Sequence, residues 1–370
     1  MVEFRKVPMF ADRVTNSPRV FERASEDHSF VHLKMNRTYT HPISWKNKMS
    51  NSRTLSRRRL LQTGAALTIL PALVPSAFGK APIAGSQVIS VHRMKLGAFE
   101  ITSMLDGYID IPPAVLQADP AMVKSMLNAG GWPDGPMRLP VNTFLVNTGE
   151  KLVLLDAGGA KMLGPTAGRL PQCLAAAGID PAQIDEVYIT HMHGDHLHGT
   201  VTPEGGKMFP NAILRISQED MNFWANPAEE AKAADNQKPR FIPAKRAVAA
   251  YGSQIKPFRL GEELTPGIKS VEAAGHSPGH SCYLVQSGNA KLLAIGDTIH
   301  VAPVQFPRPE ITVAFDWDQP KARATRLSIF DTVVKESIPI AAVHLPFPGI
   351  GVLRKKGDEF IFVPAPWQLF

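Results

Sequence analysis

The chain has 370 residues, of which 44% are hydrophobic and 20% are charged, so it can bury a large core and is not a disordered protein. Its formal net charge of +7 comes from the start of the chain, because residues 1–60 hold 13 Lys and Arg against 5 Asp and Glu, while residues 61–370 hold 27 against 28. The body therefore lacks the basic surface typical of nucleic-acid binding, and we expect no nucleic-acid partner.

Two segments precede the body. Residues 1–48 show no apolar periodicity and are interpreted as a disordered extension or a misassigned start, because Met49 would begin a leader of ordinary length. Residues 49–79 resemble a twin-arginine (Tat) signal peptide, in which Arg57–Arg59 precede an uncharged apolar stretch, 60–74, too short to span a bilayer comfortably. We expect the Tat export machinery to bind the precursor, and the mature protein to be periplasmic or secreted and free of the membrane. An uncleaved membrane anchor is the alternative.

The body, residues 80–370, alternates strand-like and helix-like patterns without a linker, which predicts a single α/β domain. In chain order the patterns predict a strand over 99–107, a hairpin over 142–159 that turns at 148–150, a helix over 165–177, a short helix at Pro181, strands over 185–190 and 212–217, a helix over 227–251, strands over 267–275, 282–287 and 291–297, a helix over 319–337 and a strand over 340–345. Hairpin-connected strands that switch with helices indicate sheets covered by helices.

Two cysteines, Cys173 and Cys282, lie far apart, and neither belongs to a CxxC pair. The sequence therefore contains no zinc-ribbon or redox motif of this kind. We interpret the two residues as buried free thiols, although a disulfide between them stays open in a chain destined for an oxidising compartment.

The densest chemical signal is His191-Met192-His193-Gly194-Asp195-His196, directly after the predicted strand 185–190. Residues two apart in an extended segment point to the same side, so His191 and His193 can face one metal ion. Asp195 and His196, on a turn that Gly194 permits, can face a second ion. Imidazole and carboxylate ligands without cysteine are typical of a catalytic ion with an open position. Adventitious metal binding by a histidine-rich loop is the alternative.

This HxHxDH pattern after a strand resembles the signature of the metallo-β-lactamase superfamily. The other elements of that signature occur in order, as Asp156-Ala157-Gly158, His276 in "GHSPGH", Asp297 after an apolar strand and His344 in "AAVHL". The resemblance implies an αββα sandwich of two mixed β-sheets flanked by helices. It further implies one ion held by His191, His193 and His276, a second ion held by Asp195, His196 and His344, and Asp297 as the bridging ligand.

Two divalent cations held about 3.5–4 Å apart lower the pKa of a bridging water, so a hydroxide held by both metals can attack without a general-base side chain. Asp195 is interpreted as a metal ligand that also relays a proton. We expect Zn²⁺, with Fe, Mn or Co as alternatives, because imidazole and carboxylate accept all of them. The sequence therefore predicts a metal-dependent hydrolase.

Longer stretches, among them "GPTAGRL" and "HLPFPGIG", resemble the methyl-parathion-hydrolase branch of the superfamily over nearly all of residues 90–365. The resemblance implies an exported dizinc esterase that cleaves a lactone, an aryl or carboxylic ester, or an organophosphate triester. It also implies an aromatic substrate pocket, in which Trp224 and Phe241 match two aromatic positions and Leu163 occupies a third. The aliphatic residue at this third position argues against efficient phosphotriester turnover. Helix packing is the alternative role for Trp224.

Three further histidines lie near the pattern. His198 is expected to face solvent, and His280 to pack or to support the ligands. His300, three residues after Asp297, either lines the pocket or faces away from it.

Other activities share the same ligands and fold. A glyoxalase-II-like thioesterase and a β-lactam hydrolase are alternatives, and an iron-binding oxidoreductase is an alternative of another class. A homodimer is also left open.

Overall fold

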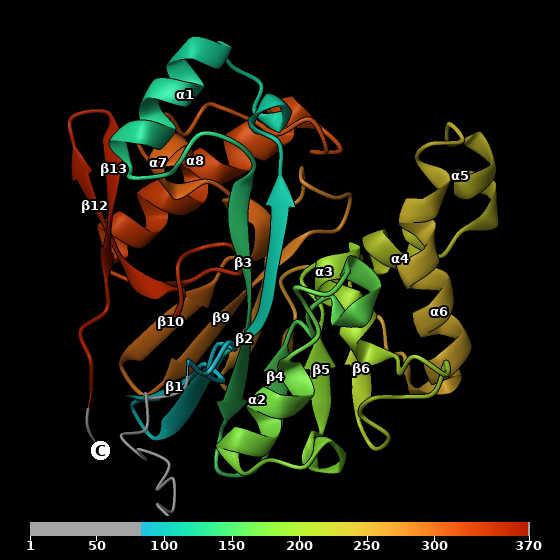
Figure 1. Ribbon diagram of the computed structural model, residues 1–370. Helices are drawn as coiled ribbons and strands as arrows, with labels where there is room; N and C mark the ends of the chain where they lie inside the picture. The colour runs from blue at the N-terminus through green and yellow to red at the C-terminus, as the bar shows by residue number, and fades with distance from the viewer. Residues whose placement is uncertain (1–82, 369–370) are drawn as a thin grey trace, which may run out of the picture. The chain divides into compact units, whose positions relative to one another are not determined.

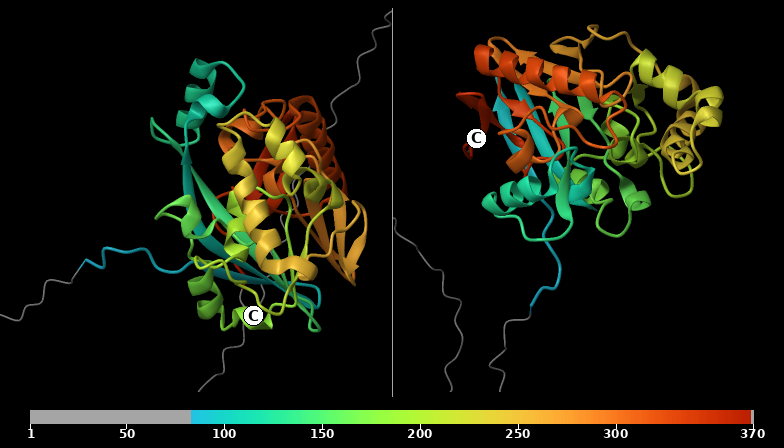
Figure 2. Two further views of the ribbon diagram at one scale, coloured as in Figure 1. Left: turned by 90° about the vertical axis from the view of Figure 1, so that its right-hand side faces the viewer. Right: turned by 90° about the horizontal axis from the view of Figure 1, so that it is seen from above.

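The computed structural model describes residues 83–368, and the predictions for residues 1–48 and 49–79 fall outside this range. Residues 83–368 belong to one compact unit. Two β-sheets run through the described part, and helices cover their outer sides (Figures 1 and 2). No helix in residues 83–368 is long and apolar enough to cross a membrane.

The first sheet has six strands that lie side by side in chain order. They are β1 (Val91–Leu96), β2 (Phe99–Ile111), β3 (Met137–Asn147), β4 (Leu152–Leu155), β5 (Glu186–Tyr188) and β6 (Ile213–Arg215). Strands β1 to β4 pair antiparallel, whereas β4, β5 and β6 are parallel, so the sheet is mixed.

The second sheet has seven strands, also in chain order. They are β7 (Glu263–Thr265), β8 (Ile268–Glu272), β9 (Ser281–Ser287), β10 (Ala290–Ala294), β11 (Ile340–Ala341), β12 (Ile350–Lys356) and β13 (Glu359–Pro364). Only the β10–β11 pair is parallel, because the chain between them forms a long crossover. This sheet is therefore mixed as well.

A buried apolar layer joins the two sheets. Phe144, Leu155 and Tyr188 of the first sheet belong to the same cluster as Tyr283 and Val285 of the second. The rings of Tyr188 and Tyr283 are 5.5 Å apart between centroids, which is within the range of favourable aromatic contacts. Side chains alternate between the faces of each strand, so the outer faces of both sheets need covers of their own.

Helices supply these covers. Apolar residues of α2 (Leu170–Ala177) and α6 (Ile242–Tyr251) pack with the outer face of the first sheet, and those of α8 (Gln319–Glu336) pack with the second. Figure 2 shows α8 along one outer side of the body. The arrangement confirms the predicted αββα sandwich. The other α-helices are α1 (Pro120–Ala129), α3 (Gly194–Leu197), α4 (Gln218–Trp224), α5 (Pro227–Lys232) and α7 (Ala302–Gln305).

The helix predicted over 227–251 is wrong as a continuous element. The chain forms α5, then a 3₁₀ helix over Lys238–Phe241, and then α6. Pro239 has no N–H to donate and restricts the residue before it, so one α-helix cannot run through this segment. The break matters for function, because the 3₁₀ helix lies beside the functional site described below.

Candidate metal centre

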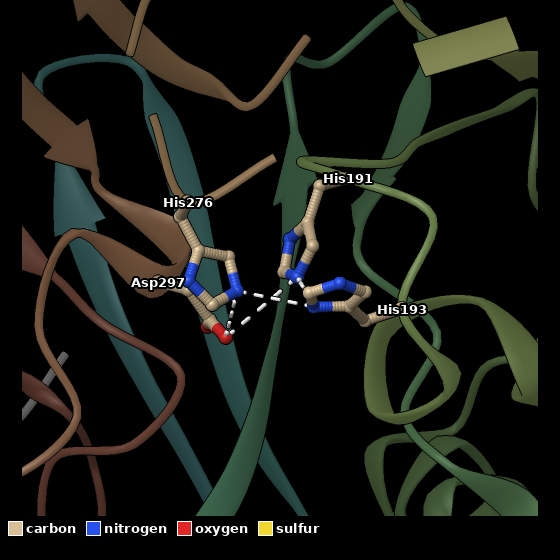
Figure 3. Close-up of side chains that lie close together, drawn as sticks. All are labelled: His191, His193, His276 and Asp297. Carbon is tan, nitrogen blue, oxygen red and sulfur yellow. Dashed lines mark hydrogen bonds and ion pairs between the residues drawn. The ribbon is translucent and has the colours of Figure 1, made fainter. Parts of the chain in front are cut away.

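Two groups of possible metal ligands meet where strands of both sheets end. The first group consists of His191, His193, His276 and Asp297, whose side chains point toward one another (Figure 3). The Nδ1 atom of His193 is 2.8 Å from Nε2 of His191 and 3.1 Å from Nε2 of His276. The Oδ2 atom of Asp297 is 3.3 Å from Nε2 of His276 and 3.7 Å from Nε2 of His191. Ligands bonded at about 2.0–2.1 Å around a tetrahedral zinc are roughly 3.3–3.4 Å apart, so these separations suit one ion.

The second group consists of Asp195, His196, Asp297 and His344. The Oδ1 atom of Asp297 is 3.1 Å from Nε2 of His196 and 3.2 Å from Nε2 of His344. The Oδ2 atom of Asp195 is 3.3 Å from Nε2 of His344 and 3.6 Å from Nε2 of His196. Asp297 thus turns one carboxylate oxygen to each group. The structure brings together all seven residues that the sequence pattern selected.

Two atoms of this cluster have no hydrogen-bond partner within the described part of the chain. They are Nε2 of His196 and Oδ1 of Asp297, and both are buried. A buried polar atom without a partner costs free energy, and for a carboxylate oxygen the cost is larger. A divalent cation between these atoms would satisfy both, so the residues fit a pair of divalent ions.

The local backbone explains how one short segment contributes to both groups. His191 follows β5 in extended chain, whereas α3 begins at Gly194 and turns Asp195 and His196 toward the other group. A Cβ on Gly194 would lie 2.8 Å from Cδ2 of His198, so a larger residue would push against that ring. The same close approach explains why His198 is buried, with 9% of its surface exposed. The prediction that His198 faces solvent is therefore wrong.

Three ligand histidines have a fixed acceptor for the other ring nitrogen. The Nδ1 atom of His196 is 2.8 Å from Oδ2 of Asp156, and that of His276 is 2.7 Å from Oδ1 of Asp316. The Nδ1 atom of His344 is 2.8 Å from the carbonyl oxygen of Pro140. These contacts assign the proton to Nδ1 and leave Nε2 free to bind a cation.

Two more histidines contact Asp297. His280 donates from Nδ1 to the carbonyl oxygen of Ala273 at 3.0 Å, and its Nε2 accepts the backbone N–H of Asp297 at 3.0 Å. His280 thus supports the bridging residue rather than the ions. The Nε2 atom of His300 lies 3.1 Å from Oδ2 of Asp297. His300 also lines a hollow above the metal ligands, so it faces the pocket and does not face away from it.

Burial and neighbouring imidazoles hold the pKa of His191 and His193 well below the ordinary value, so both are neutral and can donate a lone pair. Burial also acts to lower the pKa of His276 and His344, but contacts with the aspartates outweigh it and raise the two pKa values to about 9 and about 10. A bound cation would compete with a proton for the same nitrogen lone pairs, and the aspartates that raise these pKa values would favour the cation as well.

Two adjoining hollows open beside the ligands. The first has a volume of about 220 Å³ and is lined by Ile109, Ile111, His193, Gly194, Asp195, Arg240, Asp297, His300, Phe315 and His344. The second has a volume of about 420 Å³ and is lined by His193, Phe223, Trp224, Glu229, Lys232, Ala233, Gln237, Arg240, Phe241, Ala314, Phe315, Asp316 and Trp317. Three residues line both hollows, which therefore meet beside one ligand of the first group: His193, Arg240 and Phe315.

The structure places two of the three predicted aromatic-pocket positions in the second hollow. Trp224 lies edge-on to His193 with ring centroids 5.2 Å apart, and Phe241 lies 5.0 Å from Trp224. Leu163 is not among the lining residues of either hollow. Its side chain lies beside Gly194, because a Cβ added to Gly194 would be 3.5 Å from Cδ2 of Leu163.

The sequence analysis missed several residues of the site. Asp316 carries no motif, although it orients His276. Phe315 and Arg240 line both hollows and were also missed, because neither belongs to a sequence motif. Helix α1 was missed as well, although its start carries a local signal, the cap Asp119 followed by Pro120. No local signal of this kind marks Asp316 or Arg240.

The sandwich of two mixed sheets carries a histidine and aspartate cluster suited to divalent metal ions where strands of both sheets end. The sequence profile of the Metallo-beta-lactamase superfamily matches residues 136–335. The chain belongs to this superfamily.

Two solved structures are similar to this chain. The hydrolase AbOPH of the beta-lactamase superfamily is 32% identical with a TM-score of 0.73, over 76% of this chain and 100% of that one. AidC, a dizinc quorum-quenching lactonase in complex with a product, is 26% identical with a TM-score of 0.71, over 76% of this chain and 99% of that one.

Similar proteins of known activity include enzymes of different kinds. Ribonuclease Z of Bacillus licheniformis is 28% identical over an alignment of 162 residues that covers 38% of this chain and 52% of that protein. The atrochrysone carboxyl ACP thioesterase AgnL7 of Paecilomyces divaricatus is 26% identical over 188 residues, which are 50% of this chain and 47% of that protein. The chain thus spans about half the length of the curated relatives it matches.

Proposed function

We propose that the protein is a dizinc hydrolase that cleaves an ester-type bond in a lactone, an aryl or carboxylic ester, or an organophosphate triester. The observation that carries the proposal is the division of the two Asp297 oxygens between two groups of ligand atoms. Two cations sharing one carboxylate lie at the separation typical of two-metal hydrolases, about 3.5–4 Å. AidC, at 26% identity, is itself a dizinc lactonase, which supports the same metal.

When bound, the two cations supply Lewis acidity toward the oxygen of the scissile group and a water that is nucleophilic near neutral pH. The chain supplies the rest. Asp195 lines the first hollow, and although burial acts to raise its pKa, His196 and His344 hold that pKa well below the ordinary value. Its carboxylate therefore stays ionised and can accept a hydrogen bond from the attacking water. The proposed role of Asp195 includes passing a proton to the departing oxygen. Ester and water thereby become acid and alcohol.

The second hollow supports an ester with a sizeable apolar part. A volume of about 420 Å³ is within the range of small-molecule sites, about 300–1,000 Å³. Phe223, Trp224 and Trp317 line it, and Trp317 is 53% exposed, so an apolar chain or ring entering here would cover surface that is otherwise in water.

The resemblance to the methyl-parathion-hydrolase branch is kept as part of the proposal, and the 32% identity with the hydrolase AbOPH supports it. Among the ester types we favour a lactone or a carboxylic ester over a phosphotriester, because Leu163 does not provide an aromatic surface to either hollow. Phe315 lies where the hollows meet and partly makes up for this loss.

A panel of substrates tests the proposal: 4-nitrophenyl acetate, a thioester, a long-chain lactone, a β-lactam and a phosphotriester, each with the zinc-loaded protein and with a chelator. We expect chelator-sensitive turnover of the lactone or the carboxylic ester. Asp297→Asn should lower both zinc content and turnover at least about 100-fold, because the bridging charge is lost. Asp331→Asn is the matched control, since Asp331 pairs with Lys355 on the surface at 56% exposure.

Turnover that survives chelation and Asp297→Asn would contradict the proposal. Turnover of only the thioester or the β-lactam would replace the ester-type substrate with that alternative. Iron in place of zinc, together with activity that depends on an electron donor or on dioxygen, would favour the oxidoreductase alternative.

A further inference from the structure

Arg240 occupies the junction of the two hollows beside the metal centre. It belongs to the 3₁₀ helix Lys238–Phe241 that interrupts the chain between α5 and α6. Its side chain is half-buried and lines the hollow above the metal ligands as well as the aromatic one. A group bound at the first hollow and extending into the second would therefore pass Arg240.

The guanidinium of Arg240 has neither an ion pair nor a side-chain hydrogen bond within residues 83–368. The two acid groups of the second hollow, Glu229 and Asp316, are paired with other residues. Glu229 pairs with Lys232 at 2.7 Å, and Asp316 pairs with His276 at 2.7 Å. The carboxylates of the first hollow, Asp195 and Asp297, belong to the ligand groups. The positive charge of Arg240 thus remains available at the place where a substrate would lie.

The guanidinium of Arg240 has lost part of its hydration, because the side chain is partly buried at the junction of the two hollows, and this burial lowers the pKa of Arg240. A guanidinium that has lost water without gaining an anion can bind one at little further desolvation cost. Its planar fork fits the two oxygens of a carboxylate.

We propose that Arg240 binds a carboxylate group of the substrate, so that the enzyme prefers esters that carry a carboxylate a few atoms from the scissile bond to neutral esters of the same size. This inference rests on the proposed ester hydrolysis. The scissile group would lie over the metal ligands, the carboxylate at Arg240, and any apolar part against Trp224 and Trp317 in the second hollow.

A matched pair of chromogenic esters tests the proposal: mono-(4-nitrophenyl) glutarate and the neutral 4-nitrophenyl hexanoate, with zinc-loaded wild type, Arg240→Gln, Arg240→Lys and Lys245→Gln. Lys245→Gln is the control, because Lys245 lines neither hollow, is paired with Glu230 and is 53% exposed. We expect Arg240→Gln to lower the ratio of kcat/KM between the anionic and the neutral ester at least about tenfold. Arg240→Lys should retain part of the preference, and Lys245→Gln should leave it unchanged.

Calorimetric binding of 4-phenylbutyrate and of its neutral amide to the same four zinc-loaded proteins gives a readout that needs no turnover. We expect Arg240→Gln to weaken binding of the acid about tenfold and to leave the amide unaffected, at equal zinc content. An unchanged ester ratio or unchanged acid binding in Arg240→Gln would overturn the proposal. If no protein hydrolyses either ester, the proposed ester hydrolysis fails, while the binding measurement still decides the role of Arg240.

Discussion

Replacing Asp316 by Asn should weaken metal binding without removing a metal ligand. The Oδ1 atom of Asp316 lies 2.7 Å from Nδ1 of His276, and its Oδ2 accepts the backbone N–H of Val313 at 3.0 Å. The side chain is fully buried and also lies 3.9 Å from the buried guanidinium of Arg326. Asn keeps the size of Asp but removes the charge that favours the Nδ1–H form of His276.

Acceptors of this kind behind a ligand histidine contribute about 10–100-fold to metal affinity. A buried hydrogen bond to a charged group contributes about 1.5–3 kcal/mol to stability. Because Arg326 keeps three backbone carbonyls as acceptors, we expect a loss near the lower end, about 2 kcal/mol, in Asp316→Asn. The zinc affinity of the first ligand group should fall at least about tenfold.

Competition with a chromogenic chelator measures the zinc affinity, and denaturant unfolding of the zinc-free protein measures the stability. Asp318→Asn is the control, because Asp318 is two residues away and caps α8 through the N–H of Lys321, a role that Asn fills about equally well. Equal zinc affinity in Asp316→Asn, Asp318→Asn and the wild type would refute the role assigned to Asp316.

Two further predictions concern acid stability and the thiols. Burial acts to raise the pKa of Glu186, but hydrogen bonds from Lys151 and Arg215 outweigh it and hold the pKa below the ordinary 4.5. The ion pair therefore stabilises the fold fully above the unfolded-state pKa, and this contribution is lost as the pH falls through the lower folded pKa. Glu186→Gln should lower the free energy of unfolding by about 1.5–3 kcal/mol at pH 7 and should flatten its pH dependence below about pH 4.5. Urea titrations from pH 3 to 7 measure both effects, and an unaltered pH profile would contradict the role of Glu186. Burial raises the pKa of Cys173 to about 11 and that of Cys282 to about 12, so neither thiol should react with iodoacetamide at pH 8 in the folded protein. Mass spectrometry should find both thiols alkylated after unfolding in guanidinium. Alkylation of the native protein, or a disulfide, would contradict buried free thiols.

The sequence was most informative where the functional residues follow one another in a short contiguous pattern. The segment from His191 to His196 predicts its own division between two ions, because extended chain and a glycine turn aim side chains in two directions. Asp316 and the carbonyl of Pro140 carry no such pattern, since each reaches its histidine only after the sheets have packed, across 40 and 204 positions of the chain. Tertiary contacts of that length leave no local signal.

The same contrast holds for the fold. Apolar alternation predicts strands such as β9 and β10, and Gln319–Glu336 forms a helix within the predicted bounds. The hairpin β12–β13 was missed, although its turn contains Gly357 with φ of 62°, a position that favours glycine. The segment over 227–251 was read as one helix because its composition is helical, whereas Pro239 decides the local geometry.

The ligands are drawn from both halves of the sandwich. His191 to His196 follow a strand of the first sheet, whereas His276, Asp297 and His344 follow strands of the second. The bound ions would therefore act as cross-links between two layers that otherwise hold together through apolar contacts and a few hydrogen bonds, such as the one from the Tyr283 hydroxyl to the carbonyl oxygen of Ile189. Neither half can form a complete ion site alone, so metal binding would require the two sheets to be packed together already. Chelation should therefore weaken the contact between the sheets before either sheet unfolds.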